Sequence, residues 1–150
     1  MRVGDLMERE VVTLEACDSL DLADDIMRLG RIRHMPVVSE RRLVGILSQR
    51  NLFRAGISSV LQFRYAVERE WLAKISVQEV MTAHVFTVTP STSIRAAVGM
   101  MIDKRIGCLP VVEDGKLVGL VSESDCLRHL ACLLDISQAK EQLAELPPID

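Results

Sequence analysis

Several features are absent from this 150-residue sequence, and each absence excludes a class of protein. No apolar run approaches the roughly 20 residues that a helix needs to cross a bilayer, so we expect no membrane-spanning segment. Residues 1–5 show no apolar stretch of the signal-peptide type, which predicts a cytoplasmic protein. Acidic residues outnumber basic ones, 21 to 18, whereas nucleic-acid-binding surfaces usually carry a basic excess. We therefore expect neither a membrane nor a nucleic acid as a partner.

None of the four cysteines belongs to a Cys-x-x-Cys pair. Only Cys126, His129 and Cys132 have a spacing that resembles metal ligands. On a helix these three side chains would spread over about 120°, which is wide for chelation by one face. Cysteines of cytoplasmic proteins are usually reduced, so we expect buried free thiols and no metal.

Motifs of the common enzyme classes are also absent. The sequence has no phosphate-binding loop, no pair of catalytic carboxylates and no His-Glu metal motif. Ser122, Asp125 and His129 would share one helical face, but they would project side by side instead of converging on one reacting atom. We expect no enzymatic activity.

The most informative stretch that is present is 117–125, Leu-Val-Gly-Leu-Val-Ser-Glu-Ser-Asp. It reads as a short apolar strand that runs into a helix with Ser122 as its N-cap. A helix N-terminus offers unpaired N–H groups and a partial positive charge, which suit an anion. The Asp125 carboxylate can accept two hydroxyl hydrogen bonds, as from a ribose. Alone, the motif suits a plain helix cap equally well.

The same motif occurs earlier, at residues 43–51, as Leu-Val-Gly-Ile-Leu-Ser-Gln-Arg-Asn. The two serines, Ser48 and Ser122, lie 74 positions apart, and this offset relates most of the chain without a gap. Identical pairs include Val3 and Val77, Met7 and Met81, Thr13 and Thr87, and Pro36-Val37-Val38 and Pro110-Val111-Val112. This period is too long for a solenoid unit and indicates two homologous halves that pack together.

Each half is predicted to be a β-α-β-β-α unit preceded by a short helical turn. The first half has a turn over 3–7, strands over 11–14, 35–38 and 43–47, and helices over 19–30 and 48–55. The second has strands over 85–89, 109–112 and 117–121, and helices over 93–104 and 122–134. Asp114-Gly115 predicts a tight hairpin, and a last short helix is expected over 138–146.

Two such units, each carrying Pro-Val-Val and then Leu-Val-Gly-h-h-Ser-x-x-Asp/Asn (h is apolar), resemble the tandem CBS domain pair, or Bateman module. The resemblance covers about residues 3–134. It implies a mixed α+β fold of two CBS repeats that pack through their sheets with pseudo-twofold symmetry. We expect repeat 1 at 1–56, a helical linker at 57–76, repeat 2 at 77–134 and a C-terminal tail at 135–150.

Members of that family commonly bind adenine nucleotides or S-adenosylmethionine in two clefts between the repeats. Carried over by position, the resemblance implies a first site of Thr13, Arg33, His34, Pro36, Ser48 and Asn51. The implied second site is Thr87, Gly107, Cys108, Pro110, Ser122 and Asp125. The first site has Asn51 where a ribose-binding carboxylate is expected, but it keeps two cations before the proline. The second keeps the carboxylate and lacks those cations. Further positive charge can come from Arg50, Arg54, Lys104, Arg105 and Arg128.

The resemblance implies a stand-alone regulatory module that senses ATP, ADP, AMP or S-adenosylmethionine and modulates a separate effector protein. No obligatory cofactor is expected. The alternative is a structural or oligomerisation module whose sites have decayed. On the predicted linker helix, the apolar residues Val60, Phe63, Val67 and Trp71 either pack on their own module or form part of a homodimer interface.

Overall fold

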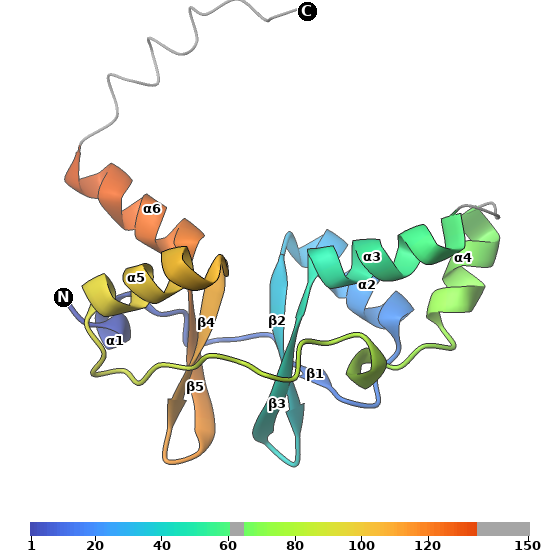
Figure 1. Ribbon diagram of the computed structural model, residues 1–150, viewed down its shortest axis with the longest axis horizontal. Coiled ribbons are helices and arrows are strands. Elements are labelled where there is room, and N and C mark those ends of the chain that lie inside the picture. Colours follow the sequence, from blue (N-terminus) through green and yellow to red (C-terminus); the bar gives the residue numbers. More distant parts are fainter. Residues whose placement is uncertain (61–64, 135–150) are drawn as a thin grey trace, which may run out of the picture.

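The computed structural model describes residues 1–60 and 65–134, apart from the side chains of 56–60 and 65–68. Two similar halves lie side by side, and each contains a two-stranded hairpin with helices on its outer side (Figure 1). The hairpins are adjacent, and their strands β3 (Arg42–Ser48) and β5 (Lys116–Ser122) contact each other. The mixed helix and strand content confirms the predicted α+β class.

The first half follows the predicted order of elements. Helix α1 (Val3–Leu6) precedes β1 (Leu14–Glu15), α2 (Leu20–Gly30), β2 (His34–Ser39), β3 and α3 (Gln49–Val60). Strand β1 pairs parallel with β2, and β2 pairs antiparallel with β3. At the hairpin turn Glu40 and Arg41 both have positive φ, 50° and 66°, which suits a two-residue turn of the primed type. The helix α3 extends five residues beyond the predicted end at residue 55.

The second half repeats this arrangement. Helix α4 (Tyr65–Leu72) and the 3₁₀ turn η1 (Val77–Glu79) lead to α5 (Ile94–Lys104), β4 (Cys108–Glu113), β5 and α6 (Glu123–Leu133). Strands β4 and β5 form an antiparallel hairpin. Its turn is the predicted Asp114-Gly115, with φ of 50° and 75°. Of the two cap candidates that the sequence offers, Thr92 and Ser93, it is Ser93 that caps α5, because its side chain accepts from the Ala96 N–H at 3.1 Å.

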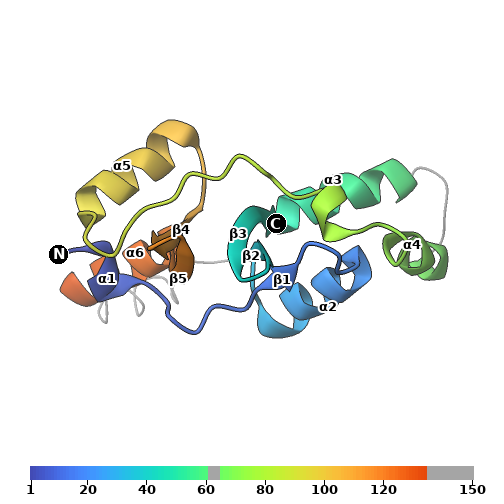
Figure 2. The ribbon, with the colours of Figure 1, turned by 90° about the horizontal axis from the view of Figure 1, so that it is seen from below.

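The segment that begins each repeat packs on the other repeat. The Val3 N–H donates to the Thr92 carbonyl oxygen at 2.8 Å, and the Val77 N–H donates to the Asp18 carbonyl oxygen at 2.7 Å. Val3 lies in the hydrophobic core of the second half and Val77 in that of the first. Figure 2 shows the two crossing segments, one blue and one yellow-green, that run between the halves. The exchange is reciprocal, as a twofold relation between the halves requires.

This exchange explains the glycine of each Leu-Val-Gly motif. A Cβ placed on Gly119 would stand 2.6 Å from the Met7 sulfur and 2.9 Å from the Glu8 carbonyl oxygen. A Cβ on Gly45 would collide in the same way with the sulfur of Met81. The glycines therefore leave room for the incoming segment of the other repeat, which pairs with the strand at this point.

The first strand of each repeat is shorter than predicted. Strand β1 spans two residues instead of the predicted 11–14, and 85–89 is reduced to one parallel bridge between Val88 and Val111. Both segments arrive from the opposite half, so they reach their pairing partner only at the end of the crossing. The β-branched composition of these segments indicated extended chain but not where pairing would begin.

Some predictions fall outside the part of the chain that is described. These are the helix over 138–146, the position of Phe63, and the side chains of Val60 and Val67. Trp71, the remaining member of that apolar group, is 51% exposed. Among the described helices, none combines the length and apolar character that crossing a bilayer requires.

Candidate functional site

Two clefts lie between the halves, with volumes of about 970 Å³ and 240 Å³. The 74-residue offset relates their linings. Corresponding residues are Ser48, Asn51, Arg105 and Ile106 in the larger cleft, and Ser122, Asp125, Arg31 and Ile32 in the smaller. Each cleft is thus built from the helix start of one repeat and the helix end of the other, which the close packing of the halves brings together.

The two predicted serines each close a capping box. The Ser48 hydroxyl donates to Asn51 Oδ1 at 2.6 Å, and the Ser48 N–H donates to the same oxygen at 2.8 Å. In return the Asn51 N–H donates to Ser48 Oγ at 3.2 Å. Because the hydroxyl hydrogen is engaged, a phosphate can receive it only if the hydroxyl turns away from Asn51. Ser48 therefore acts as a helix cap, and a ligand would have to bind the groups of this turn that the capping box leaves free.

The equivalent pair in the smaller cleft is more fully engaged. The Ser122 hydroxyl donates to Asp125 Oδ2 at 2.6 Å, and Arg128 donates to the other carboxylate oxygen at 3.1 Å. Both oxygens of the carboxylate that was expected to hold a ribose thus have partners within the same helix. A ribose would have to compete with these groups, in a cleft of one quarter the volume.

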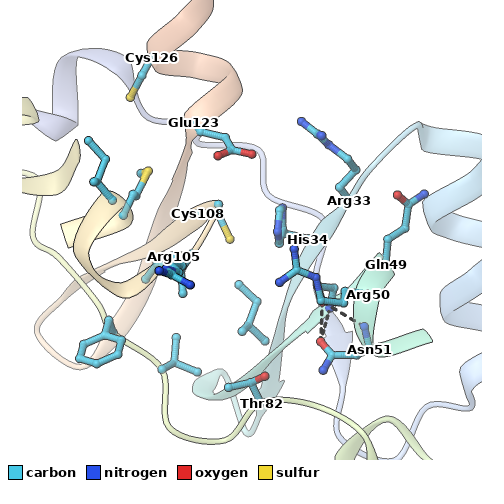
Figure 3. Close-up of a pocket in the computed structure, with 18 of the residues that line it drawn as sticks. Arg33, His34, Gln49, Arg50, Asn51, Thr82, Arg105, Cys108, Glu123 and Cys126 are labelled. Carbon is cyan, nitrogen blue, oxygen red and sulfur yellow. Dashed lines mark hydrogen bonds between the residues drawn. The ribbon is translucent and has the colours of Figure 1, made fainter. Parts of the chain in front are cut away.

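The larger cleft is rich in cations. Its charged and imidazole side chains are Arg33, Arg50, Arg54, Arg105, His34, His84 and a single acid, Glu123. In Figure 3, Arg50 and Arg105 lie on opposite sides of the cleft that both line. Lys104, a possible further source of positive charge, places its Nζ 5.2 Å from the ring centroid of Phe86, which lines this cleft. The arginines make this cleft a favourable place for an anionic group.

His34 lies where the halves meet, close to the helix start of the other repeat. A Cβ on Gly107 would stand 3.1 Å from His34 Cε1 and 3.2 Å from Glu123 Oε1. Partial burial lowers the pKa of His34 below its ordinary value, and the charge of Arg33 lowers it further, whereas Glu123 acts in the opposite direction. The imidazole is therefore neutral at neutral pH.

The wall opposite the arginines of α3 is mainly apolar and comes from the second half. Its members are Val85, Phe86, Val98, Met101, Ile102, Ile106, Cys126 and Leu127. Phe86 and Ile102 keep 46% and 70% of their surface exposed, which is unusual for large apolar side chains unless something covers them. An apolar wall beside convergent polar groups is the usual composition of a small-molecule site.

Eight of the twelve predicted site residues line a cleft. They are Arg33, His34, Ser48, Asn51, Gly107, Cys108, Ser122 and Asp125. The other four do not: Thr13 and Thr87 are exposed, and Pro36 and Pro110 are buried within β2 and β4. The grouping also differs from the sequence prediction, because Cys108 shares the larger cleft with Ser48, and Arg33, His34 and Gly107 line both clefts. The role of all twelve as ligand contacts stays a prediction.

The sequence did not single out several residues of the larger cleft. Thr82, His84 and Phe86 belong to the crossing segment, and Glu123 occupies the position equivalent to Gln49. The repeat offset relates residues within the two halves but does not reveal an exchange between them. The one sequence feature that reflects the exchange is a large Met7 and Met81 facing a small Gly119 and Gly45. These pairs can be recognised only once the fold is known.

The cysteines show no reactive or metal-binding arrangement among the described residues. Burial raises the pKa of Cys108 to about 12, with further contributions from Glu123 and Asp125. That thiol therefore stays protonated and unreactive. The expectation of buried thiols is wrong for Cys17 and Cys132, which are exposed.

Comparisons with known sequences identify the repeat. The family model of the CBS domain matches residues 3–58 and 77–132. Inosine-5′-monophosphate dehydrogenase of Korarchaeum cryptofilum is 33% identical over 83% of this chain, but the match covers only 23% of that enzyme. The uncharacterized protein MJ1426 of Methanocaldococcus jannaschii is 27% identical, over 87% of this chain and 91% of that protein. The chain thus spans less than a quarter of the enzyme and most of the small protein.

Solved structures show the same architecture. A Vibrio cholerae protein provisionally assigned to acetoin utilization (AcuB) superposes with a TM-score of 0.75 and 32% identity, over 98% of both chains. The CBS domain pair of protein MJ0100, in complex with 5′-methylthioadenosine and S-adenosyl-L-methionine, gives a TM-score of 0.74 and 25% identity. That match covers 87% of this chain and 99% of the other.

Proposed function

This chain belongs to the CBS domain family as a tandem pair, and on that premise we propose that it is a regulatory module sensing an adenine nucleotide or S-adenosylmethionine. The observation that carries the proposal is the larger cleft, which joins an arginine-rich wall to an apolar wall in about 970 Å³. This composition suits a ligand with an anionic chain at one end and a planar base at the other.

The proposed contacts in the larger cleft are Arg33, His34, Ser48 and Asn51. The oxygen of Asn51 is occupied by Ser48, so its amide nitrogen is the group that can donate to a ribose oxygen. Ser122 and Asp125 would serve a ligand in the smaller cleft. The presence of adenosine compounds in the CBS pair of MJ0100 supports a ligand with an adenosine group.

We propose that these groups serve regulation rather than catalysis. The Ser122 hydroxyl and the Asp125 carboxylate are engaged with each other and with the backbone N–H groups of the helix start, which is the arrangement of a helix cap. A ligand that touches both repeats can instead favour one arrangement of the halves over another, and a separate effector protein would read that difference.

Thermal unfolding with ATP, ADP, AMP and S-adenosylmethionine tests the proposal. We expect a saturable rise in melting temperature with at least one of the four. Asn51→Ala and Asp125→Ala form a matched pair, because each removes the same capping interaction from one cleft. Loss of the shift in Asn51→Ala alone assigns the ligand to the larger cleft. A flat response of the wild-type protein to all four compounds would end the adenine-ligand proposal.

The exposed apolar residues favour a second role, in self-association. Phe53 on α3 and Trp71 on α4 are 67% and 51% exposed. We propose that this region contributes to a homodimer, with or without a ligand. Light scattering would show a dimer that dissociates in Trp71→Ala, and a monomer at all concentrations would contradict it.

A further inference from the structure

Two arginines from opposite repeats converge on the larger cleft. Arg50 lies in the first turn of α3, and Arg105 directly follows α5. Both line the cavity, and Figure 3 shows them on opposite sides of it. Their guanidinium groups therefore present positive charge from both halves of the molecule.

Neither arginine has an acidic partner in residues 1–60 and 65–134. Arg28 and Arg69 pair with Asp25, and Arg128 pairs with Asp125, but no ion pair involves Arg50 or Arg105. The one acid of the larger cleft, Glu123, lies beside Gly107 and His34. The positive charge of the two arginines is thus not paired within the described residues and is available to a group that enters the cleft.

The backbone at Arg105 is also unfavourable for an arginine. Its φ and ψ are 54° and 45°, the left-handed conformation that ends many helices and is normally occupied by glycine. Arg31, the equivalent residue of the first repeat, has φ of 52° and ψ of 38°. A side chain at either position costs free energy that glycine would not, so glycine can replace each arginine without backbone strain and the two positions form a matched pair.

The smaller cleft has no equivalent pair. The position that corresponds to Arg50 is Ser124, whose hydroxyl accepts a hydrogen bond from Arg33 at 2.7 Å. Arg31 therefore faces no second arginine on the first turn of α6. The smaller cleft is also lined by Arg33 and Arg128, but Arg33 donates to Ser124 and Arg128 donates to Asp125.

We infer that Arg50 and Arg105 form a clamp, spanning both repeats, for the phosphate chain of a nucleoside polyphosphate in the larger cleft. The inference rests on the proposed function and narrows its ligand. Two planar guanidinium groups match the several oxygens of a di- or triphosphate. S-adenosylmethionine offers a single carboxylate and carries positive sulfonium and ammonium groups, so the clamp favours a polyphosphate over it.

Calorimetric titration of the wild-type protein, Arg105→Gly and Arg31→Gly with ATP, S-adenosylmethionine and inorganic pyrophosphate tests the clamp. Glycine relieves the left-handed backbone at both positions, so both variants should show a higher urea midpoint. Arg105→Gly should weaken ATP binding about tenfold or more, as loss of a charge-assisted contact does. Arg31→Gly should change it less than about twofold.

Each other outcome has a distinct meaning. Three outcomes would overturn the clamp and leave the adenine-ligand proposal standing. These are unchanged ATP affinity in Arg105→Gly, equal weakening of ATP binding in Arg31→Gly, and tighter binding of S-adenosylmethionine than of ATP. Pyrophosphate binding that requires Arg105, without ATP binding, overturns the clamp as a site for a nucleoside polyphosphate. Binding of neither ATP nor pyrophosphate overturns the clamp.

Discussion

Met7 of the first repeat lies over Gly119 of the second, so closely that a Cβ at position 119 would stand 2.6 Å from its sulfur. The same relation, with the repeats interchanged, holds for Met81 and Gly45. The contact ties each repeat to the segment that precedes the other. It also brings Thr82, His84 and Phe86 into the larger cleft, so the architecture and the candidate site have a common origin.

Gly119→Ala should therefore destabilise the fold. The added methyl meets the Glu8 carbonyl oxygen as well as the flexible Met7 side chain, and the expected loss is about 1–3 kcal/mol in the free energy of unfolding. Gly99→Ala is the control, because it lies within α5 with no atom within 4 Å of its Cβ. That variant should gain roughly 0.5–1 kcal/mol. Urea denaturation that ranks the two variants in the reverse order would contradict the exchange.

The capping boxes should contribute to stability whether or not a ligand binds. Ser48→Ala and Ser122→Ala each remove a hydroxyl that both donates to and accepts from the residue three positions on. Each should lower the free energy of unfolding by about 1 kcal/mol. Thermal or urea unfolding measures this loss, and the absence of any change in both variants would show that these hydrogen bonds do not form in solution.

The ion pair between α2 and α4 predicts an acid-sensitive contribution. Hydrogen bonds from Arg69 lower the pKa of Asp25 from 3.8 to about 2, and the charges of Arg69 and Arg28 act in the same direction. The stabilisation is complete above the unfolded pKa and is lost as pH falls through the folded one. Asp25→Asn should thus be less stable than the wild type at pH 6, with the difference closing toward pH 2.

Asp24→Asn serves as its control, because it removes a neighbouring carboxylate of the same helix that forms none of these ion pairs. Unfolding curves over this pH range should place Asp24→Asn close to the wild type. A constant difference between Asp25→Asn and the wild type at all pH values would contradict the role of the ionised pair.

His34 should make both stability and ligand binding depend on pH. Because burial lowers its folded pKa below 6.5, the unfolded chain takes up a proton first, and stability falls as pH drops below that value. A phosphate nearby would raise the pKa of the same imidazole, so binding of a phosphate-bearing ligand should be accompanied by proton uptake.

The corresponding measurement is the ATP dissociation constant at pH 8 and pH 6 for the wild type and His34→Gln. The wild type should gain more affinity on acidification than the variant, since the titration of ATP itself is common to both. An equal pH dependence of the ATP dissociation constant in the two proteins would show that His34 does not lie near the phosphates.

Local features of the fold could be predicted from sequence because neighbouring residues determine them. The Asp114-Gly115 turn, the Ser93 cap and the contacts of Ser48 with Asn51 all lie within a few residues. The exchange of segments could not be predicted, because the sequence does not show whether the segment before each repeat packs on its own half or on the other half.

For the same reason the sequence grouped Cys108 with Ser122 and did not connect Arg105 with Ser48. The offset of 74 residues identifies equivalent positions. It does not say which positions of the two repeats face one another, because that depends on how the halves pack.

The most direct test of the account is a titration of the ¹⁵N-labelled chain with ATP, followed by amide chemical shifts. A ligand in the larger cleft should move the signals of residues 48–51 and 105–108 together, with one saturation curve, since these segments of different repeats line the same cavity. Shifts confined to one repeat, shifts centred on Ser122 and Asp125 alone, or no saturable change would contradict it.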